Sequence, residues 1–241
     1  MCTLAVSFYP KTECPLIIAA NRDENPERPS EPWTLRNNNK IFSPLDVRKG
    51  TWIGCNDKGV FAAITNWDIE PDLHGLLSRG IVVMNILKCK TMSDIIYYLC
   101  GINAKDYNSF NIIFGNKDVL QHFSCDHKKT NLVDLQSGLH ISTGWGVNTN
   151  CKREEFIKSE LQKKFNRFEQ PIAESDLQKC MMAHNDGIGS DHSICVHDDN
   201  HEWETRSSVI MMMKHNTWFV KYVDTAPCCA DNWNTYELEV Q

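Results

Sequence analysis

Residues 1–24 read MCTLAVSFYPKTECPLIIAANRDE and predict a β-hairpin at the start of the chain. Thr3–Phe8 is apolar and β-prone, and Pro15–Asn21 is a second run of the same kind. The dipeptide Pro10-Lys11 between the two runs predicts the turn. Pairing of these strands returns the end of the second to the start of the first. We therefore expect the N-terminus to lie beside the charged residues that follow Asn21.

Cys2 is the candidate nucleophile of this hairpin. A small residue at position 2 allows methionine aminopeptidase to remove Met1, which would make Cys2 the N-terminal residue. The thiol is then a nucleophile, and the α-amine, with a reference pKa of about 7.7–8.0, can accept its proton. A neighbouring Arg22 would favour the thiolate, and Asp23 would orient the amine. The alternative is that the polar residues following Ala20 form a solvated charged turn.

The rest of the chain predicts one α+β domain over residues 1–241. We expect further strands at Thr51–Asn56, Val60–Asn66, Phe110–Gly115, Val119–Ser124, Ser193–His197, Glu204–Met213 and Thr217–Val223. We expect helices at Ser78–Lys88, Ser93–Cys100, Lys152–Phe165 and Ile172–His184. The Pro-rich segment Glu24–Lys40 has the composition of a loop. Strands at both ends with helices between them predict a helix-covered sandwich of mostly antiparallel sheets.

Three asparagines are candidates for stabilising an oxyanion. Asn66 ends the second predicted hairpin and is followed by Trp67, whereas Asn148 and Asn150 lie in a later polar segment. An asparagine that leaves a strand is commonly a turn residue. Its amide N–H groups can instead donate to an oxyanion, and loss of such a donor costs about 2.7–4 kcal/mol of transition-state stabilisation. Both explanations apply at all three positions.

Composition argues against several classes of function. The formal net charge is −6 and no Lys/Arg block occurs, so we expect no nucleic-acid partner. Apolar runs such as Pro15–Ala20 are too short to cross a bilayer, so we expect no transmembrane segment. The N-terminus lacks the pattern of a secretion signal, and we expect a cytoplasmic protein.

The 11 cysteines are expected to be free thiols in a reducing compartment. No CxxC pair occurs, and Cys228-Cys229 has no partner at metal-finger spacing. His192, Cys195 and His197 are close in sequence, but strand alternation would turn His192 away from the other two. We therefore expect no metal site.

A series of short motifs spans nearly the whole chain. They are Met1-Cys2, Ala20–Glu24, Arg28–Ser30, Gly50–Gly54, Gly59–Asn66, Ser78–Gly80 and Thr205–Ser208. In their residues and their order, the chain resembles the NRDE family, the proteins related to transport and Golgi organisation protein 2. That family in turn is similar to the N-terminal-nucleophile hydrolases, especially choloylglycine hydrolases, penicillin V acylases and cysteine acyltransferases.

This resemblance implies an αββα four-layer fold with Cys2 as the nucleophile and Asn66 as an oxyanion donor. It also implies that Arg22 and Asp23 hold the thiol and the amine. In those acylases two residues usually separate the Arg from the Asp, whereas here the two are adjacent. Adjacent side chains of a strand point to opposite faces, so only one of them would face Cys2, and Glu24 is a possible substitute.

The function implied is that of an amidohydrolase or acyltransferase acting on a small amide or acyl substrate through a thioester at Cys2. No cofactor is needed for this chemistry. The family pattern usually has Asn where this chain has Thr149, so Asn148 is assigned as the second oxyanion partner, with Asn150 as the alternative. The residues assigned to substrate binding are Asn21, Glu24, Trp67, Asn150 and Arg206.

Two other functions are compatible with the same resemblance. Some relatives are implicated in haem trafficking or in lipid and acyl-CoA homeostasis, which would make the protein a non-enzymatic carrier with haem as a ligand. A purely structural partner of secretory organelles is the third possibility. In a eukaryotic cell, either function is compatible with association with mitochondria or the Golgi.

Overall fold

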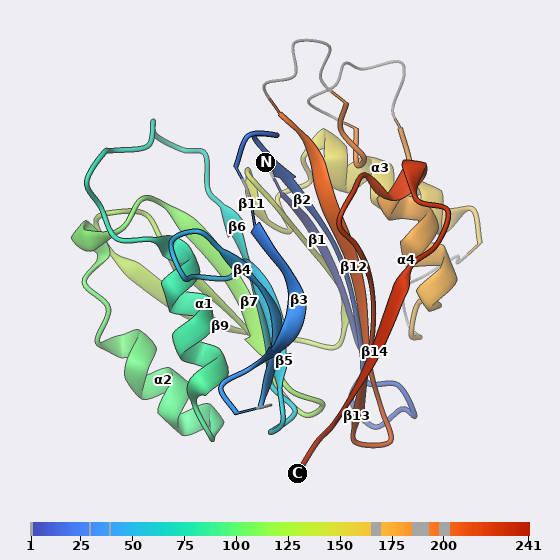
Figure 1. Ribbon diagram of the computed structural model, residues 1–241, viewed down its shortest axis with the longest axis horizontal. Helices are drawn as coiled ribbons and strands as arrows, with labels where there is room; N and C mark the ends of the chain where they lie inside the picture. The colour runs from blue at the N-terminus through green and yellow to red at the C-terminus, as the bar shows by residue number, and fades with distance from the viewer. Residues whose placement is uncertain (1, 29, 39, 165–169, 185–192, 198–202) are drawn as a thin grey trace.

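Two antiparallel β-sheets face each other in the computed structural model, which describes residues 2–28, 30–38, 40–164, 170–184, 193–197 and 203–241 (Figure 1). The first sheet has the strand order β11-β10-β1-β2-β12-β13-β14. In that order its strands are Gly146–Val147, Gly138–Thr143, Thr3–Phe8, Leu16–Glu24, Glu204–Lys214, Thr217–Val223 and Asn234–Glu239. The second sheet runs in sequence order from β3 to β9. Its strands are Ser30–Arg36, Ile41–Asp46, Ile53–Asn56, Phe61–Asn66, Phe110–Gly115, Leu120–Cys125 and Thr130–Leu135.

Helices cover the outer face of each sheet (Figure 1). The helices α1 and α2 lie on the second sheet, and α3 and α4 lie on the first. Their bounds are Arg79–Lys88 for α1, Met92–Cys100 for α2, Lys152–Gln162 for α3 and Glu174–Met181 for α4. Two short 3-10 helices, η1 at Ala104–Asp106 and η3 at Pro227–Cys229, complete the described elements. The predicted αββα four-layer arrangement is therefore confirmed.

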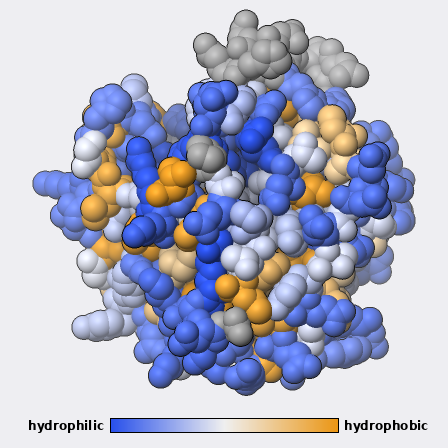
Figure 2. Space-filling view, viewed as in Figure 1, coloured by the Kyte–Doolittle hydropathy of each residue, from blue (hydrophilic) through white to orange (hydrophobic). Residues whose placement is uncertain are grey.

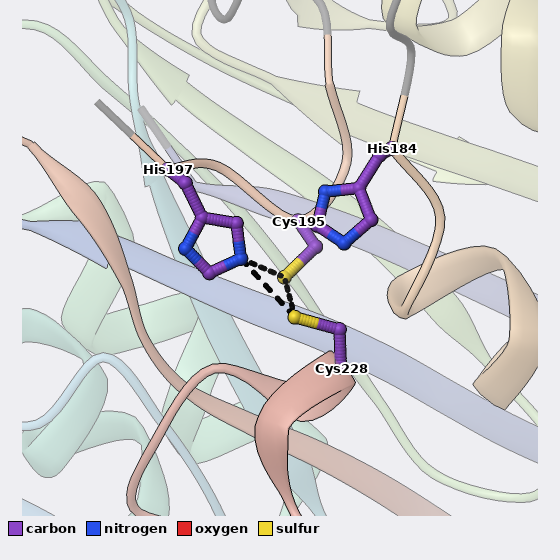
Figure 3. A group of neighbouring side chains, drawn as sticks. All are labelled: His184, Cys195, His197 and Cys228. Carbon is purple, nitrogen blue, oxygen red and sulfur yellow. Dashed lines mark hydrogen bonds between the residues drawn. The ribbon is translucent and has the colours of Figure 1, made fainter. Parts of the chain in front are cut away.

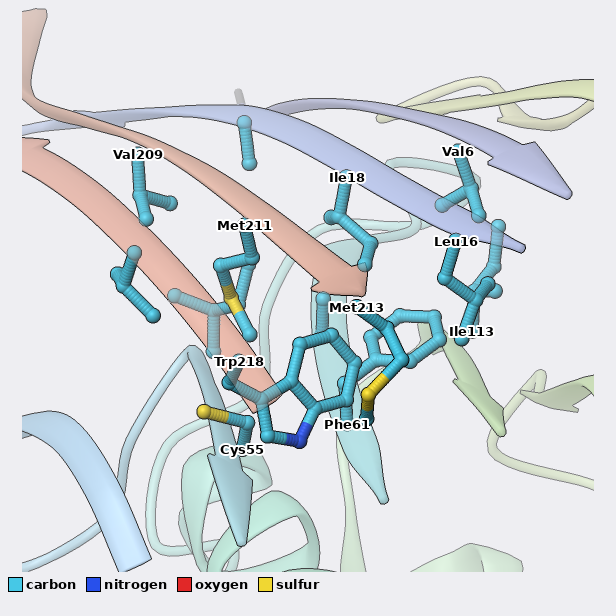
Figure 4. Close-up of a cluster of buried hydrophobic side chains, with 14 of the residues drawn as sticks. Val6, Leu16, Ile18, Cys55, Phe61, Ile113, Val209, Met211, Met213 and Trp218 are labelled. Carbon is cyan, nitrogen blue, oxygen red and sulfur yellow. The ribbon is translucent and has the colours of Figure 1, made fainter. Parts of the chain in front are cut away.

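Three separate hydrophobic clusters hold these four layers together. The cluster between the sheets includes Ile18, Phe61 and Trp218, all with 0% exposure (Figure 4). A second cluster joins α1 and α2 to the second sheet, and a third joins α3 and α4 to the first. Both faces of strand β2 are buried, which explains why its sequence is apolar without a break. Ile18 packs between the sheets, whereas Ala19 packs against the helices.

The predicted N-terminal hairpin is confirmed. Strands β1 and β2 pair in antiparallel register, with Thr3 opposite Asn21, and β2 continues to Glu24. Strand β12 pairs with the other edge of β2, where Thr205 lies opposite Asp23. The polar end of β2 is thus part of a strand that pairs with β12, and Asn21, Arg22 and Asp23 are buried, so the interpretation as a solvated turn is wrong.

Other element predictions need correction. The segment predicted as a loop at Glu24–Lys40 contains strand β3, and strands β4, β9, β10, β11 and β14 were not expected. Ser193–His197 is no regular strand, because its pairing is a single bridge from His197 to Glu204. Helix α2 begins at Met92, one residue before the predicted start at Ser93, because the side chain of Thr91 forms a capping box. Helices α3 and α4 end at Gln162 and Met181, earlier than expected, and Phe165 lies outside the described residues.

No helix in the described part of the chain is long and apolar enough to cross a membrane. On the face of the molecule in Figure 2, hydrophobic residues form small groups surrounded by hydrophilic ones. Among the described residues drawn on this face, the apolar side chains do not form one continuous surface.

Candidate active site

Strand alternation divides the polar residues of the N-terminal hairpin between two faces. Leu4 and Ile18 point between the sheets, and their even-numbered neighbours Cys2 and Arg22 share that side. The odd-numbered residues, such as Asp23, point instead toward α3 and α4. The first side borders a cavity, and the second side is part of the core.

The cavity has a volume of about 340 Å³ and opens at the ends of β2 and β6. The polar and charged side chains on its wall include Cys2, Arg22, Glu24, Arg28, Asp46, Asn66 and Arg79. The apolar side chains include Leu45, Trp52, Ile64, Leu73, Leu76 and Leu77. The structure thus brings Cys2, Arg22, Glu24 and Asn66 together around one space. Residues 72–80, in the connection that leads into α1, form another part of its wall.

The Cys2 thiol is half-buried at this cavity. Its Sγ lies 4.0 Å from the backbone carbonyl oxygen of Asp23. Burial raises the pKa of the Cys2 thiol above its ordinary value, and the Asp23 charge raises it further, whereas Arg22 opposes the shift. The thiol is therefore held in its neutral form, and a nucleophilic reaction needs a base that removes the proton as the bond forms.

Four charged side chains form an alternating network on the cavity wall. Arg28 lies 2.9 Å from both Glu24 and Asp46, and Arg22 lies 3.4 Å from Glu24 and 3.6 Å from Asp46. Arg22 is buried and the two carboxylates are 15% exposed, so the network is partly shielded from water. Glu24 therefore lies on the cavity wall with Cys2, where it pairs with two arginines, and its substitution for Asp23 stays a prediction. Because both carboxylates are engaged by guanidinium groups, we assign no cation to them.

On the opposite face, Asp23 forms a buried ion pair with Arg153 of α3. The guanidinium of Arg153 donates to the Asp23 carboxylate at 3.0 Å and to the Thr3 hydroxyl at 2.9 Å. The hydroxyl of Thr205 donates to the other carboxylate oxygen at 2.7 Å. Only 2% of the Arg153 side chain and 1% of the Asp23 side chain are exposed. This arrangement agrees with the expectation that Arg22 and Asp23 face opposite ways, and it fixes the backbone whose carbonyl faces Cys2.

Asn21 lies on the side of β2 that faces the helices, as Asp23 does, and it does not line the cavity. Its side-chain amide donates to the carbonyl oxygens of Met181 at 2.8 Å and Ile194 at 2.9 Å. Both acceptors belong to the segments that cover the first sheet. The structure therefore does not bring Asn21, which was predicted to bind substrate, to the cavity, because its side chain is fully buried and cross-links the fold.

Asn66 and Trp67 differ in their position at the end of β6. Asn66, opposite Phe110 in the register, lines the cavity with Cys2. Trp67 is not part of the cavity wall, and its backbone N–H donates to the Ser109 carbonyl at 3.1 Å. The oxyanion role of Asn66 stays a prediction that this position allows, whereas Trp67 would reach a substrate only beyond the cavity itself.

Asn148, Asn150 and Arg206 lie away from the cavity wall. The Asn148 carboxamide accepts from the Ile141 N–H and contacts the His140 ring at 3.0 Å. Asn150 lies before α3, where its carboxamide oxygen accepts from Lys158 at 3.1 Å. Arg206 pairs with Glu204 at 2.9 Å on β12. The structure does not bring these three residues to Cys2.

Sequence reasoning missed Asp46, Arg79 and Arg153. Arg79 belongs to a motif quoted for the family resemblance, and its guanidinium pairs with Asp72 at 2.8 Å on the cavity wall. Asp46 and Arg153 had no comparable signal, because each meets β2 only through tertiary contacts.

A Cβ on Gly50 would lie 2.6 Å from the Gly80 carbonyl carbon, so the glycines in these motifs allow α1 to approach closely.

The fold of this chain is similar to that of several solved structures. The chain is similar to a Caenorhabditis elegans N-acylethanolamine-hydrolyzing acid amidase ortholog, with a TM-score of 0.60, 11% identity and coverage of 96% of this chain and 95% of that one. A mutant conjugated bile acid hydrolase from Clostridium perfringens matches with a TM-score of 0.56, 10% identity and coverage of 98% and 96%. At these identities the likeness establishes the fold alone.

Relatives by sequence agree with the motifs. The Transport and Golgi organization protein 2 homolog of Homo sapiens is 38% identical over 125 residues, which cover 47% of this chain and 44% of that protein. The Mus musculus homolog is 37% identical over 127 residues, with the same coverage. The chain thus matches less than half the length of these curated relatives. The family model described as Transport and Golgi organisation 2 matches residues 1–226, and the chain belongs to this family.

Proposed function

We propose that the protein is an N-terminal cysteine amidohydrolase or acyltransferase that acts on a small amide or acyl substrate through a thioester at Cys2. The observation that carries this proposal is that Cys2, Arg22 and Asn66 line one cavity. The fold supports it further, because similar solved structures carry the names of an amidase and a bile acid hydrolase.

The reaction would begin after removal of Met1, which lies outside the described residues. The Cys2 α-amine takes the thiol proton as the sulfur attacks the substrate carbonyl, which suits a thiol that burial keeps neutral. The Asn66 amide and a backbone N–H stabilise the oxyanion. The amine then returns the proton to the leaving nitrogen, which leaves an acyl thioester on Cys2. Water or a second amine takes the acyl group and restores the thiol.

The cavity wall supports an amphipathic substrate. Leucine and tryptophan side chains form one part of the wall, and the arginines at positions 22, 28, 48 and 79 form another. An acyl chain would contact the apolar part, and a polar or anionic head group would face the arginines. The Glu24 and Asp46 carboxylates partly neutralise Arg22 and Arg28, and Asp72 pairs with Arg79, so the net attraction for an anion depends most on Arg48.

Intact-mass measurement and variants of Cys2 test this proposal. The purified protein is expected to lack Met1 and to hydrolyse members of a panel of acyl p-nitroanilides that differ in chain length. Cys2→Ala is expected to abolish both turnover and iodoacetamide labelling at position 2. Cys100→Ser, which removes an exposed thiol of α2, is the matched control and should leave turnover unchanged. Retained Met1, or full activity of Cys2→Ala, would reject the proposal.

Asn66→Leu tests the oxyanion assignment separately. Loss of one oxyanion donor is expected to lower kcat by about 10²–10³-fold with little change in KM. Asn148→Leu is the comparison variant, because Asn148 lies outside the cavity wall and should leave kcat within a few-fold of the original value. The reverse ranking of the two variants would move the oxyanion site to Asn148.

The alternative function, a carrier of haem, is tested by adding haemin to the protein and following its absorption spectrum. A saturable Soret shift in a protein that shows no turnover on the amide panel would favour the carrier. Turnover that depends on Cys2, without such a shift, favours the enzyme.

A further inference from the structure

Four side chains with metal-binding atoms converge at one place outside the cavity: His184, Cys195, His197 and Cys228 (Figure 3). Their ligand atoms all lie within 4.8 Å of one another. The residues come from three segments, namely the chain after α4, the segment 193–197 and the 3-10 helix η3. Two thiols and two imidazoles from separate parts of the sequence are therefore brought together by the tertiary structure.

The spacing of these atoms is that of a tetrahedral coordination shell. With Zn–S bonds of about 2.3 Å and Zn–N bonds of about 2.05 Å, a tetrahedral ion separates two sulfurs by about 3.8 Å and a sulfur from a nitrogen by about 3.6 Å. The Sγ atoms of Cys195 and Cys228 are 3.5 Å apart. The His197 Nε2 lies 3.7 Å from the first and 3.1 Å from the second. The His184 and His197 rings are stacked with centroids 5.1 Å apart, and a ring nitrogen of His184 lies within 4.8 Å of the other three ligand atoms.

We propose that His184, Cys195, His197 and Cys228 bind one structural Zn²⁺ ion. Two thiolates and two imidazoles form a ligand set that zinc favours over hard cations such as Mg²⁺ and Ca²⁺. Four protein ligands leave no open position for water, so the site would be structural. Binding forms two Zn–S and two Zn–N bonds and releases one proton from each thiol to solvent.

Backbone hydrogen bonds already hold the ligand segments in place. The Cys195 N–H donates to the Ala183 carbonyl at 3.0 Å, which joins the segment of two ligands to that of His184. The Val196 N–H donates to the Thr205 hydroxyl at 2.8 Å, and the same hydroxyl donates to the Asp23 carboxylate. The ion would therefore stabilise the segment that supports Asp23, on the core face of β2. The zinc proposal does not depend on the proposed acyl-transfer function.

Two other uses of these side chains fit the geometry less well. A disulfide between Cys195 and Cys228 needs a sulfur separation of about 2.05 Å, against 3.5 Å here. Haem iron takes axial ligands from opposite sides of a flat macrocycle, whereas here four ligand atoms crowd around one point and leave no plane for the ring.

Metal binding is tested on the full-length protein after reduction and removal of metal by a chelator. Zn²⁺ added in competition with a chromophoric chelator is expected to bind at one ion per chain. Co²⁺ is expected to give the visible absorption of tetrahedral thiolate coordination. Cys228→Ser and His184→Ala should each weaken Zn²⁺ binding at least about tenfold. Both positions are at least partly exposed, so these variants should fold, whereas Cys195 is buried.

Cys229→Ser is the matched control, because its sulfur lies only 3.5 Å from that of Cys228 but does not belong to the four-residue group. Zn²⁺ should raise the thermal unfolding midpoint of the original protein and of Cys229→Ser, but not that of the Cys228→Ser, His184→Ala double variant. Equal Zn²⁺ affinity of the original protein and the double variant would overturn the proposal. A Cys195–Cys228 disulfide that forms equally fast with and without saturating Zn²⁺ would also overturn it.

Discussion

Removing one partner of the Arg153–Asp23 ion pair is expected to destabilise the protein far more than breaking a surface pair of similar geometry. The two side chains are 2% and 1% exposed and their charged atoms are 3.0 Å apart. Substitution of either residue removes the buried opposite charge of the other, which costs about 3–5 kcal/mol of unfolding free energy. Arg206 and Glu204, 2.9 Å apart, are 38% and 31% exposed, and such a pair contributes about 0.2–1 kcal/mol.

A double-mutant cycle measured by urea unfolding tests this difference. Arg153→Met and Asp23→Asn should each lower the free energy of unfolding by about 3–5 kcal/mol. The double variant should cost less than the sum of the two, because the attraction between the two charges is lost only once. Arg206→Met is the control and should change the free energy by about 1 kcal/mol or less.

The reasoning would be refuted by either of two results. The first is a loss below about 1 kcal/mol for both single variants, which would mean that water reaches the pair in solution. The second is additivity of the two losses, which would mean that the residues act independently. Intact mass and circular dichroism of each variant verify that the folded state being compared is the same.

Four further variants test other parts of the structure. Gly50→Ala would put a Cβ 2.6 Å from the Gly80 backbone and should cost about 1–3 kcal/mol in urea unfolding. Gly101→Ala, whose Cβ would meet its nearest atom at 3.4 Å, should be nearly neutral. Burial lowers the pKa of His122 to about 4, so the unfolded state binds its proton first and stability falls as pH falls from 6.5 to 4. Between pH 7.5 and 5.0 this loss should be about 2 kcal/mol, and it should disappear in His122→Gln. Asn21→Ala leaves two buried carbonyls without their donor and should lower the thermal midpoint, at a cost of about 1–3 kcal/mol for each carbonyl.

Local patterns predicted the N-terminal hairpin and several strands, because apolar runs and turns act within a few residues. Strand β3 was not predicted, and there is a physical reason for this. It contains Pro32 and lies at the edge of the second sheet, where a proline is tolerated because one side of the strand needs no donor. The register of β3 shifts between Glu31 and Thr34, on either side of that proline. Composition alone cannot separate such an edge strand from a loop.

The sequence predicted those parts of the candidate site whose positions follow from the register of the N-terminal hairpin. Pairing of β1 with β2 brings Cys2 near Arg22, and strand alternation sends Asp23 the other way. The partners of these residues were not predictable, because Arg153 lies 130 residues from Asp23 in the chain. The sequence grouped Cys195 and His197 with His192 and predicted no metal site, because His184 and Cys228 are brought beside Cys195 and His197 only by the fold.

The signature Asn21-Arg22-Asp23-Glu24 belongs to two structural environments at once. Its even positions form ion pairs on the cavity wall, whereas its odd positions are buried and bind α3, α4 and β12. Substituting the whole signature would therefore confuse loss of folding with loss of chemistry. Variants of the residues that pair with the signature separate loss of folding from loss of chemistry. Asp46→Asn perturbs the wall while leaving the core contacts of β2 intact, and Arg153→Met does the reverse. A defect in turnover from Asp46→Asn at unchanged stability would assign the even positions to the reaction.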